Sequence, residues 1–220
     1  MKLALDDTGN VGGMIQYLPI EHSFADGKKL YLILCLWFHG HKKGHGNFQK
    51  RGMRKDLLQA AEVDVKALGA KGLAAPAIFL PLWMKACWFK NQRYQKVDKN
   101  GMRILHWKPF VDQATPSRWI RTKKRPSTIL GKIGVTPFIN DWCPAQNMVF
   151  ERMKRASMEL WNKVAFQEIH IHPHKTFLEW GISNGIYIDG NEWHTGPSSK
   201  YKKIKKILTR KMKELKSVNT

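Results

Sequence analysis

The chain has 220 residues, of which 43% are hydrophobic, and its 38 lysines and arginines outweigh 17 acidic residues to give a net charge of +21 at pH 7. Apolar residues in this proportion can form a packed core, which excludes an intrinsically disordered chain. So large a positive charge works against compactness by self-repulsion, and its common use is to bind a polyanion. We therefore expect nucleic acid as the partner, the alternative being a basic surface that only aids solubility.

The spacing of the cysteines and the hydropathy of the chain indicate the cellular compartment in which the protein is expected. Cys35, Cys87 and Cys143 are far apart, and none belongs to a Cys-x-x-Cys pair. This pattern indicates free thiols in a reducing compartment rather than a cysteine zinc module. Residues 1–10 lack the apolar core of a secretory signal, and the most apolar stretch, 73–89, is interrupted by prolines, so we expect no membrane span. A cytoplasmic protein is the prediction.

The N-terminal part predicts strands followed by a helix. Residues 2–5 and 14–18, with turn residues between them, indicate a hairpin or meander. The continuously apolar run 30–38 predicts a buried central strand. Apolar residues at helical spacing then predict a helix over 53–68, which Gly69 is well placed to end.

A second helix and a basic hairpin are expected next. Pro81 suits the first turn of a helix, and Lys99-Asn100-Gly101 predicts a tight turn between strands 93–98 and 102–107. Two helices followed by a basic hairpin have the outline of a winged-helix unit, although the same order arises in other α+β domains.

Two basic segments in the first 126 residues are candidate phosphate contacts. The loop 39–47 is rich in glycine, histidine and lysine, and its alternative role is that of an exposed turn. The run 118–126 places cations around a tryptophan, which suits a single strand because the charges contact phosphates while the ring stacks on a base. The candidates are Lys42, Lys43, Arg118, Trp119, Arg121, Lys123, Lys124 and Arg125.

The last third predicts two helices with strands between them. A helix is expected within 141–167, a strand over 168–172, and a hairpin that joins 177–182 to 186–189. The final helix, after Ser198 or Ser199, is amphipathic and basic, and such a helix can bind nucleic acid, an anionic membrane surface or the groove of a partner. Its candidate nucleic-acid contacts are Lys202, Lys203, Lys205, Lys206 and Arg210.

Three histidines alternate along the predicted strand. His170, His172 and His174 would share one face if the strand continued through Pro173. His-Ile-His resembles the His-hydrophobe-His motif of rolling-circle replication initiators and relaxases. The resemblance implies that the histidines hold a divalent metal and that Tyr201 attacks the scissile phosphate. The alternative is a set of exposed histidines on a sheet face that touches phosphate or water.

These patterns predict a mixed α+β protein, with antiparallel hairpins, packed helices and a basic C-terminal amphipathic helix. We expect an N-terminal part over 1–112, a basic connecting segment over 113–127 and a C-terminal part over 128–220, or one continuous domain.

The leading functional prediction is a non-enzymatic nucleic-acid-binding protein that acts through phosphate contacts, with RNA or single-stranded DNA favoured over duplex. Other protein subunits of a ribonucleoprotein assembly are compatible partners. The alternatives are a metal-dependent endonuclease and a basic-helix binder of a membrane surface or a partner protein. No cofactor is expected, apart from a divalent metal for the endonuclease.

Overall fold

The fold is α+β, as the sequence predicts. The computed structural model describes residues 1–41, 46–48, 51–79, 84–160, 162–194 and 198–218. The chain forms two compact units, unit 1 from Met1 to Ile120 and unit 2 from Arg121 to Thr220. The division falls inside the segment 113–127 that the sequence suggests as a connection. No helix in the described part of the chain is long and apolar enough to cross a membrane.

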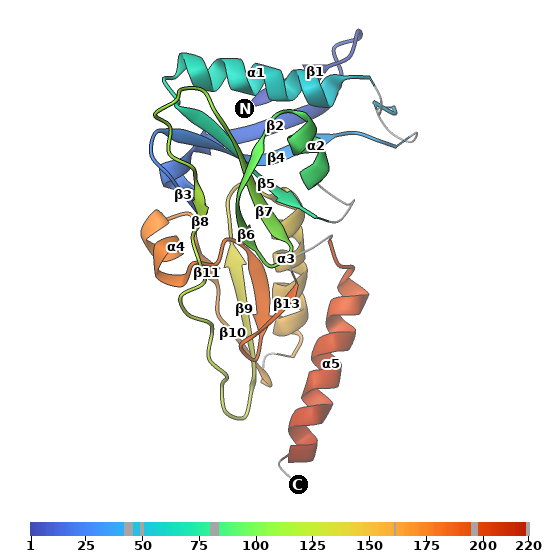
Figure 1. Cartoon of the computed structure of the whole chain (residues 1–220). Coiled ribbons are helices and arrows are strands. Elements are labelled where there is room, and N and C mark those ends of the chain that lie inside the picture. The colour runs from blue at the N-terminus through green and yellow to red at the C-terminus, as the bar shows by residue number, and fades with distance from the viewer. Residues whose placement is uncertain (42–45, 49–50, 80–83, 161, 195–197, 219–220) are drawn as a thin grey trace. The chain divides into compact units, whose positions relative to one another are not determined.

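Unit 1 is built on a six-stranded sheet with the order β1-β2-β4-β5-β7-β6 (Figure 1). Neighbouring strands are antiparallel except β4 and β5, which are parallel and joined by helix α1. A short two-stranded sheet pairs β3 with β8. The elements are β1 (Lys2–Leu5), β2 (Val11–Pro19), η1 (Ile20–His22), β3 (Ala25–Asp26), β4 (Leu30–Phe38), α1 (Met53–Ala67), β5 (Gly72–Ile78), α2 (Ala86–Asn91), β6 (Gln95–Asn100), β7 (Arg103–Pro109) and β8 (Arg118–Trp119).

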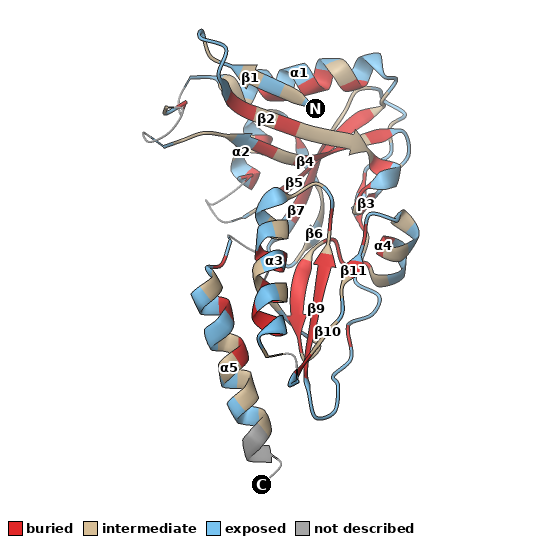
Figure 2. Cartoon of the chain, turned by 180° about the vertical axis from the view of Figure 1, so that it is seen from behind, coloured by how far each residue is buried: buried red, intermediate tan, exposed pale blue. Residues whose placement is uncertain are grey.

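Helix α1 covers one face of this sheet, and buried residues recur along one side of it (Figures 1 and 2). Leu57, Leu58 and Val65 of α1 pack into one core cluster with Ile15 of β2 and Ile33 of β4. Full burial of each leucine contributes about 1.5–3 kcal/mol. The helical spacing that predicted 53–68 therefore marks the face that meets the sheet.

The winged-helix outline is wrong. Strand β5 separates α1 from α2, and the β6–β7 hairpin supplies two strands of the large sheet instead of standing apart as a wing. The hairpin itself is confirmed, because β6 and β7 flank the Asn-Gly turn. Pro81 lies outside the described residues, and α2 begins at Ala86.

Unit 2 contains a five-stranded sheet with the order β10-β9-β12-β13, in which β11 also pairs with β9. Strand β9 is buried along nearly its whole length (Figure 2). Met153 of α3 and Ile204 and Leu208 of α5 pack into the same core cluster as Ile133 and Val135. The elements are β9 (Ile133–Ile139), α3 (Pro144–Met158), β10 (Val164–Phe166), β11 (Ile169–His170), α4 (His174–Trp180), β12 (Gly185–Ile188), β13 (Asn191–His194) and α5 (Tyr201–Val218).

Two predictions for unit 2 need correction. Helix α3 ends at Met158, and Val164, which lies in the range 141–167 expected to contain the helix, pairs with Ile133 as the first residue of β10. The predicted hairpin over 177–189 is wrong because its first half is helix α4. Gly181 ends that helix in the left-handed conformation, with its N–H bonded to the carbonyl of Phe177.

Candidate active site

A β-bulge in β4 sets the shape of unit 1. Gln16 of β2 pairs with Cys35 and Tyr17 pairs with Ile33, so Leu34 is an extra residue on β4. A bulge of this kind bends its strand and increases the local twist. The bulge therefore turns the second half of β4 away from the direction of the first half.

The parallel strands β4 and β5 separate where this bulge occurs. They pair only from Leu30 opposite Gly72 to Leu32 opposite Ala74, although β4 continues to Phe38 and β5 to Ile78. Beyond this point, residues 33–38 and 75–78 are no longer partners of each other; we call this region the strand divergence. Where two strands part, the edges that face each other can present main-chain donors and acceptors to an extended ligand.

The far end of β5 has a different partner. Ile78 forms an isolated parallel bridge with Lys85, and its N–H donates to the carbonyl of Met84. Because Ile78 also pairs with Arg103 of β7, this bridge lies on the edge that faces β4. Residues 75–77 are therefore the part of β5 in the strand divergence for which no such bridge is described.

Helix α1 begins beside the strand divergence. As the crossover between parallel strands, α1 starts near the carboxyl end of β4, the edge at which ligands bind in sheets with parallel strands. Gly52 is its N-cap, in the left-handed conformation at φ 81°, and no side chain caps the helix. Free N–H groups and the positive end of the helix dipole make such an end an anion site.

Arg54 strengthens the case for an anion at this end. Its guanidinium lies 3.8 Å above the ring of Trp88, and in the described part of the chain its Nε is buried without a hydrogen-bond partner. Burial lowers the pKa of Arg54 to about 10. Arg51 and Lys55 add positive charge, and the only acid in the first turn is Asp56. A half-buried cation at the positive end of a helix dipole is unfavourable unless an anion is bound.

The central basic run does not form a stacking platform. Trp119 is only 6% exposed; it stacks on Phe24 with a centroid separation of 5.8 Å, and Arg103 lies over its ring. The main-chain N–H of Trp119 donates to the carboxylate of Asp98. Arg118 lies in β8, and Lys124 pairs with Glu179. Arg121, Lys123 and Arg125 are exposed, whereas Lys42 and Lys43 lie outside the described residues.

The apolar face of the final helix, α5, packs against the core of unit 2. Ile204 and Leu208 are fully buried in the core of unit 2, so this face is not free for a membrane or a partner. Lys205 pairs with Glu159 at 2.6 Å, and Arg210 contacts Glu214 at 3.6 Å. The remaining predicted contacts, Lys202, Lys203 and Lys206, are exposed.

The histidine strand is shorter than predicted. His170 ends β11 and contacts Glu168 at 3.5 Å, and His172 contacts Asp141 at 3.5 Å. Their ring centroids are 6.5 Å apart. His174 instead starts helix α4, where its ring lies 6.0 Å from that of Phe177. Among the residues with a described position, no group of three histidines, cysteines or acids could hold a metal ion.

Tyr201 is engaged elsewhere. Its hydroxyl donates to the carboxylate of Glu159, and the guanidinium of Arg155 lies 4.3 Å from its ring centroid. These contacts hold the first turn of α5 against the end of α3.

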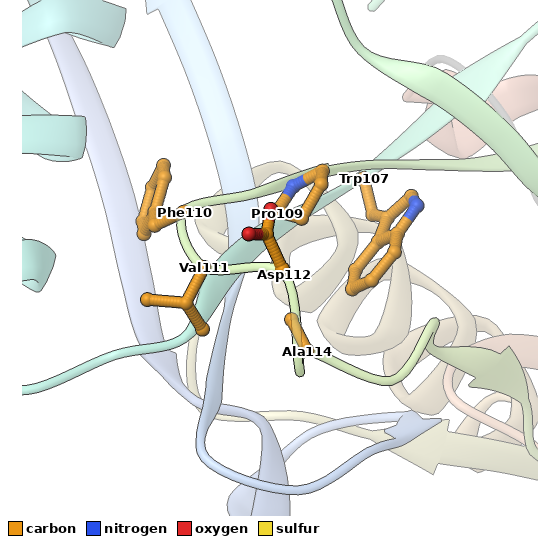
Figure 3. Close-up of a pocket in the computed structure, with 6 residues that line it drawn as sticks. All are labelled: Trp107, Pro109, Phe110, Val111, Asp112 and Ala114. Carbon is orange, nitrogen blue, oxygen red and sulfur yellow. The ribbon is translucent and has the colours of Figure 1, made fainter.

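A pocket of about 320 Å³ lies after the end of β7 (Figure 3). Pro109 of β7 pairs with Gly72, the first residue of β5, so this pocket is at the opposite end of β5 from the strand divergence. Its lining consists of Trp107, Pro109, Phe110, Val111, Asp112 and Ala114.

No known family and no curated protein matches the sequence. Solved structures resemble it slightly. A GNAT-family N-acetyltransferase (YhbS) of Escherichia coli, in complex with CoA, has 10% identity and a TM-score of 0.39 over 53% of this chain and 64% of its own. The PaiA N-acetyltransferase of Thermoplasma acidophilum, in complex with coenzyme A, has 14% identity and a TM-score of 0.36 over 48% and 57%.

A putative GNAT-family acetyltransferase of Desulfovibrio desulfuricans has 17% identity and a TM-score of 0.37 over 48% of this chain and 64% of its own. This chain therefore spans less than two thirds of each of these proteins. With TM-scores this low, the likenesses by themselves carry no argument about what the chain does.

The predicted function is corrected on these findings. The predicted nucleic-acid-binding function, the nuclease alternative and the expectation of a non-enzymatic protein find no support among the solved structures named above, which are acetyltransferases. The contacts of Trp119, His172 and Tyr201 agree with this correction. The ring of Trp119 is not open for stacking, and no metal site is assembled among the described residues. Neither the strand divergence nor Arg54 was singled out in the sequence.

Proposed function

We propose that unit 1 binds an acyl-CoA thioester and transfers its acyl group to an acceptor. The observation that carries the proposal is the bulge at Leu34, which parts β4 from β5 beside the uncapped start of α1. An extended strand edge and an anion site thus adjoin each other in one unit.

Coenzyme A suits this arrangement chemically. It consists of a diphosphate-bearing nucleotide joined to an extended arm that contains two amide groups and ends in a thiol. Residues 52–54 and the Arg54 guanidinium would hold the diphosphate. Residues 33–38 and 75–77 would flank the arm, whose amides can hydrogen-bond to main chain as an added strand does.

The reaction follows from the position of the thioester. When bound, the thioester supplies an acyl carbon that is activated toward an incoming nucleophile. The main chain of β4 offers N–H groups that can stabilise the negative charge that develops on the carbonyl oxygen. The two flanking strands hold the acyl group in one orientation, which lowers the entropic part of the barrier.

Two of the similar structures contain CoA, the ligand proposed here, but the likeness is too slight to add weight. A cytoplasmic location, which the three separated cysteines led us to expect, also fits a donor that is made and used inside the cell.

The test is calorimetric binding of CoA and of pantetheine, which keeps the arm but lacks the diphosphate. We expect Arg54→Gln to weaken CoA binding about tenfold or more and to leave pantetheine binding unchanged, because a charge-assisted contact to phosphate is lost. Lys66→Gln is the matched control, since Lys66 lies in the last turn of the same helix. Absence of CoA binding to the unaltered protein, or equal losses in both variants, would overturn the proposal.

A further inference from the structure

Three aromatic rings form a row where β4 ends. The rings of Trp37 and His39 have centroids 6.0 Å apart, and those of His39 and His41 are 5.7 Å apart. Both pairs meet edge to face, at 71° and 77°. Alternate residues of an extended chain share one face, so the row lies along a single side of the sheet.

This row lies on the face opposite α1. Trp37 pairs with Met14, which in turn pairs with Leu3, so the three side chains share one face. The next position along β2, Gly13, faces α1, because a Cβ built on it would lie 3.2 Å from Leu57 of that helix. Neighbouring residues of a strand point to opposite faces, which places Trp37 away from the helix.

The same face is apolar and exposed near the strand divergence. Leu3 is 49% exposed and Trp37 is 43% exposed. Trp37 also lies beyond Leu34, in the part of β4 that has turned away from β5. Exposed apolar side chains grouped on one face of a sheet mark a binding surface more often than single exposed residues do.

The position of this row relative to the anion site indicates what it would bind. If the diphosphate lies at the start of α1 and the arm passes between β4 and β5, the acyl group emerges on the face away from α1. That face carries Trp37 and His39. An acceptor that approaches the acyl carbon therefore meets an indole ring first and an imidazole next to it.

We infer that this row is the acceptor site of the proposed acyltransferase and that it takes an aromatic amine carrying a single positive charge. The inference rests on the proposed function. The aromatic ring of the acceptor stacks on Trp37, and its nitrogen lies at His39. The net charge of +21 works against acceptors with several positive charges, such as polyamines.

The reaction balances with His39 as the base. The ammonium group of the acceptor gives one proton to the imidazole of His39, since histidine is the side chain that most often serves as a general base. The neutral nitrogen then forms a bond to the acyl carbon, and the carbon–sulfur bond breaks. The second proton of the nitrogen passes to the departing sulfur, so the products are an amide and a free thiol. The imidazolium releases its proton to solvent.

The test compares 2-phenylethylamine, n-hexylamine and spermidine as acceptors with acetyl-CoA, and measures the release of free thiol by the full chain. We expect kcat/KM for 2-phenylethylamine to exceed that for n-hexylamine about tenfold, and spermidine to be the poorest acceptor. Trp37→Ala should remove the preference mainly through KM, and Trp37→Phe should restore it. His39→Gln should lower kcat about 100-fold.

Phe79→Ala is the matched control, because Phe79 follows the last residue of β5, is 78% exposed and is not part of the row. It should leave the preference for 2-phenylethylamine unchanged. CoA affinity, measured in parallel, should be unchanged in His39→Gln and Phe79→Ala, because both residues lie outside the ranges proposed to flank the arm. Equal turnover of n-hexylamine, a preference that survives Trp37→Ala, or no transfer to any amine while CoA binds would overturn the inference and leave the proposed CoA site standing. Failure of CoA to bind would overturn the proposed function instead.

Discussion

The hydroxyl of Tyr94 donates a 3.1 Å hydrogen bond to the carboxylate of Glu62, and Lys108 donates to the same carboxylate at 2.7 Å. Tyr94 is 2% exposed and Glu62 is 9% exposed. Burial, followed by the charge of Glu62, raises the pKa of Tyr94 well above its ordinary value. Because Glu62 belongs to α1 and Lys108 to β7, this group fixes the helix to the sheet.

Tyr94→Phe should therefore lower the free energy of unfolding by about 1–3 kcal/mol, since a buried carboxylate loses one of its donors. The measurement is urea denaturation followed by circular dichroism. Tyr31→Phe is the matched control, because no side-chain hydrogen bond of the Tyr31 hydroxyl is described, and it should change stability by less than about 0.5 kcal/mol. Equal effects of the two changes would contradict the role given to Glu62.

Asp64 should make the stability of unit 1 sensitive to acid. Hydrogen bonds from Lys2 and then Tyr17 hold its pKa below the ordinary value of 3.8. A carboxyl group with a lowered pKa stabilises the fold above its unfolded pKa, and this contribution is lost as the pH falls through the folded pKa. The difference in unfolding free energy between the unaltered protein and Asp64→Asn should stay constant from pH 7 to about 5 and shrink below about 4. A difference that grows as the pH falls would contradict the predicted direction of the pH dependence, and with it the lowered pKa of Asp64.

Gly181 should be far more sensitive to substitution than another glycine with similar backbone geometry. It has φ 68°, and a Cβ would lie 1.9 Å from the carbonyl oxygen of Arg121. Gly181→Ala should cost more than about 3 kcal/mol, because left-handed strain and a clash with main chain add together. Gly131, with φ 72°, has nothing within 4 Å of the same position. Gly131→Ala should lower the free energy of unfolding by about 1 kcal/mol. Thermal unfolding of both variants is the measurement, and equal losses would contradict the clash at Gly181.

Trp119 should behave as a core residue. Trp119→Ala should destabilise the protein by about 3–5 kcal/mol, because it leaves a cavity beneath Phe24 and Arg103. Trp37→Ala, at an exposed tryptophan of the same unit, should cost less than about 1 kcal/mol. The measurement is chemical denaturation of both variants. A loss of stability at Trp119 as small as that at Trp37 would contradict its role as a core residue.

Several elements could be predicted because their signals are local. The apolar run 30–38 became β4, the helical spacing of 53–68 became α1, and the Asn-Gly turn joined β6 to β7. Each depends on residues within a few positions of one another.

The candidate site could not be predicted in this way. The bulge at Leu34 is visible only as a register between β2 and β4, and the divergence requires the pairing of β5, which lies some forty residues later in the chain. Trp119 misled for a related reason. Its neighbours in sequence are cations, but the residues that bury it, Phe24 and Arg103, are distant in sequence.

Leu34 also has an evolutionary consequence. Removing this one residue would restore continuous pairing of β2 with β4 and leave nothing to bend β4 away from β5. The gain or loss of a single codon could therefore open or close this sheet, with no other change in the order of its strands. Among homologous chains, an insertion or deletion at this position should separate those that keep a ligand site from those that retain only the scaffold.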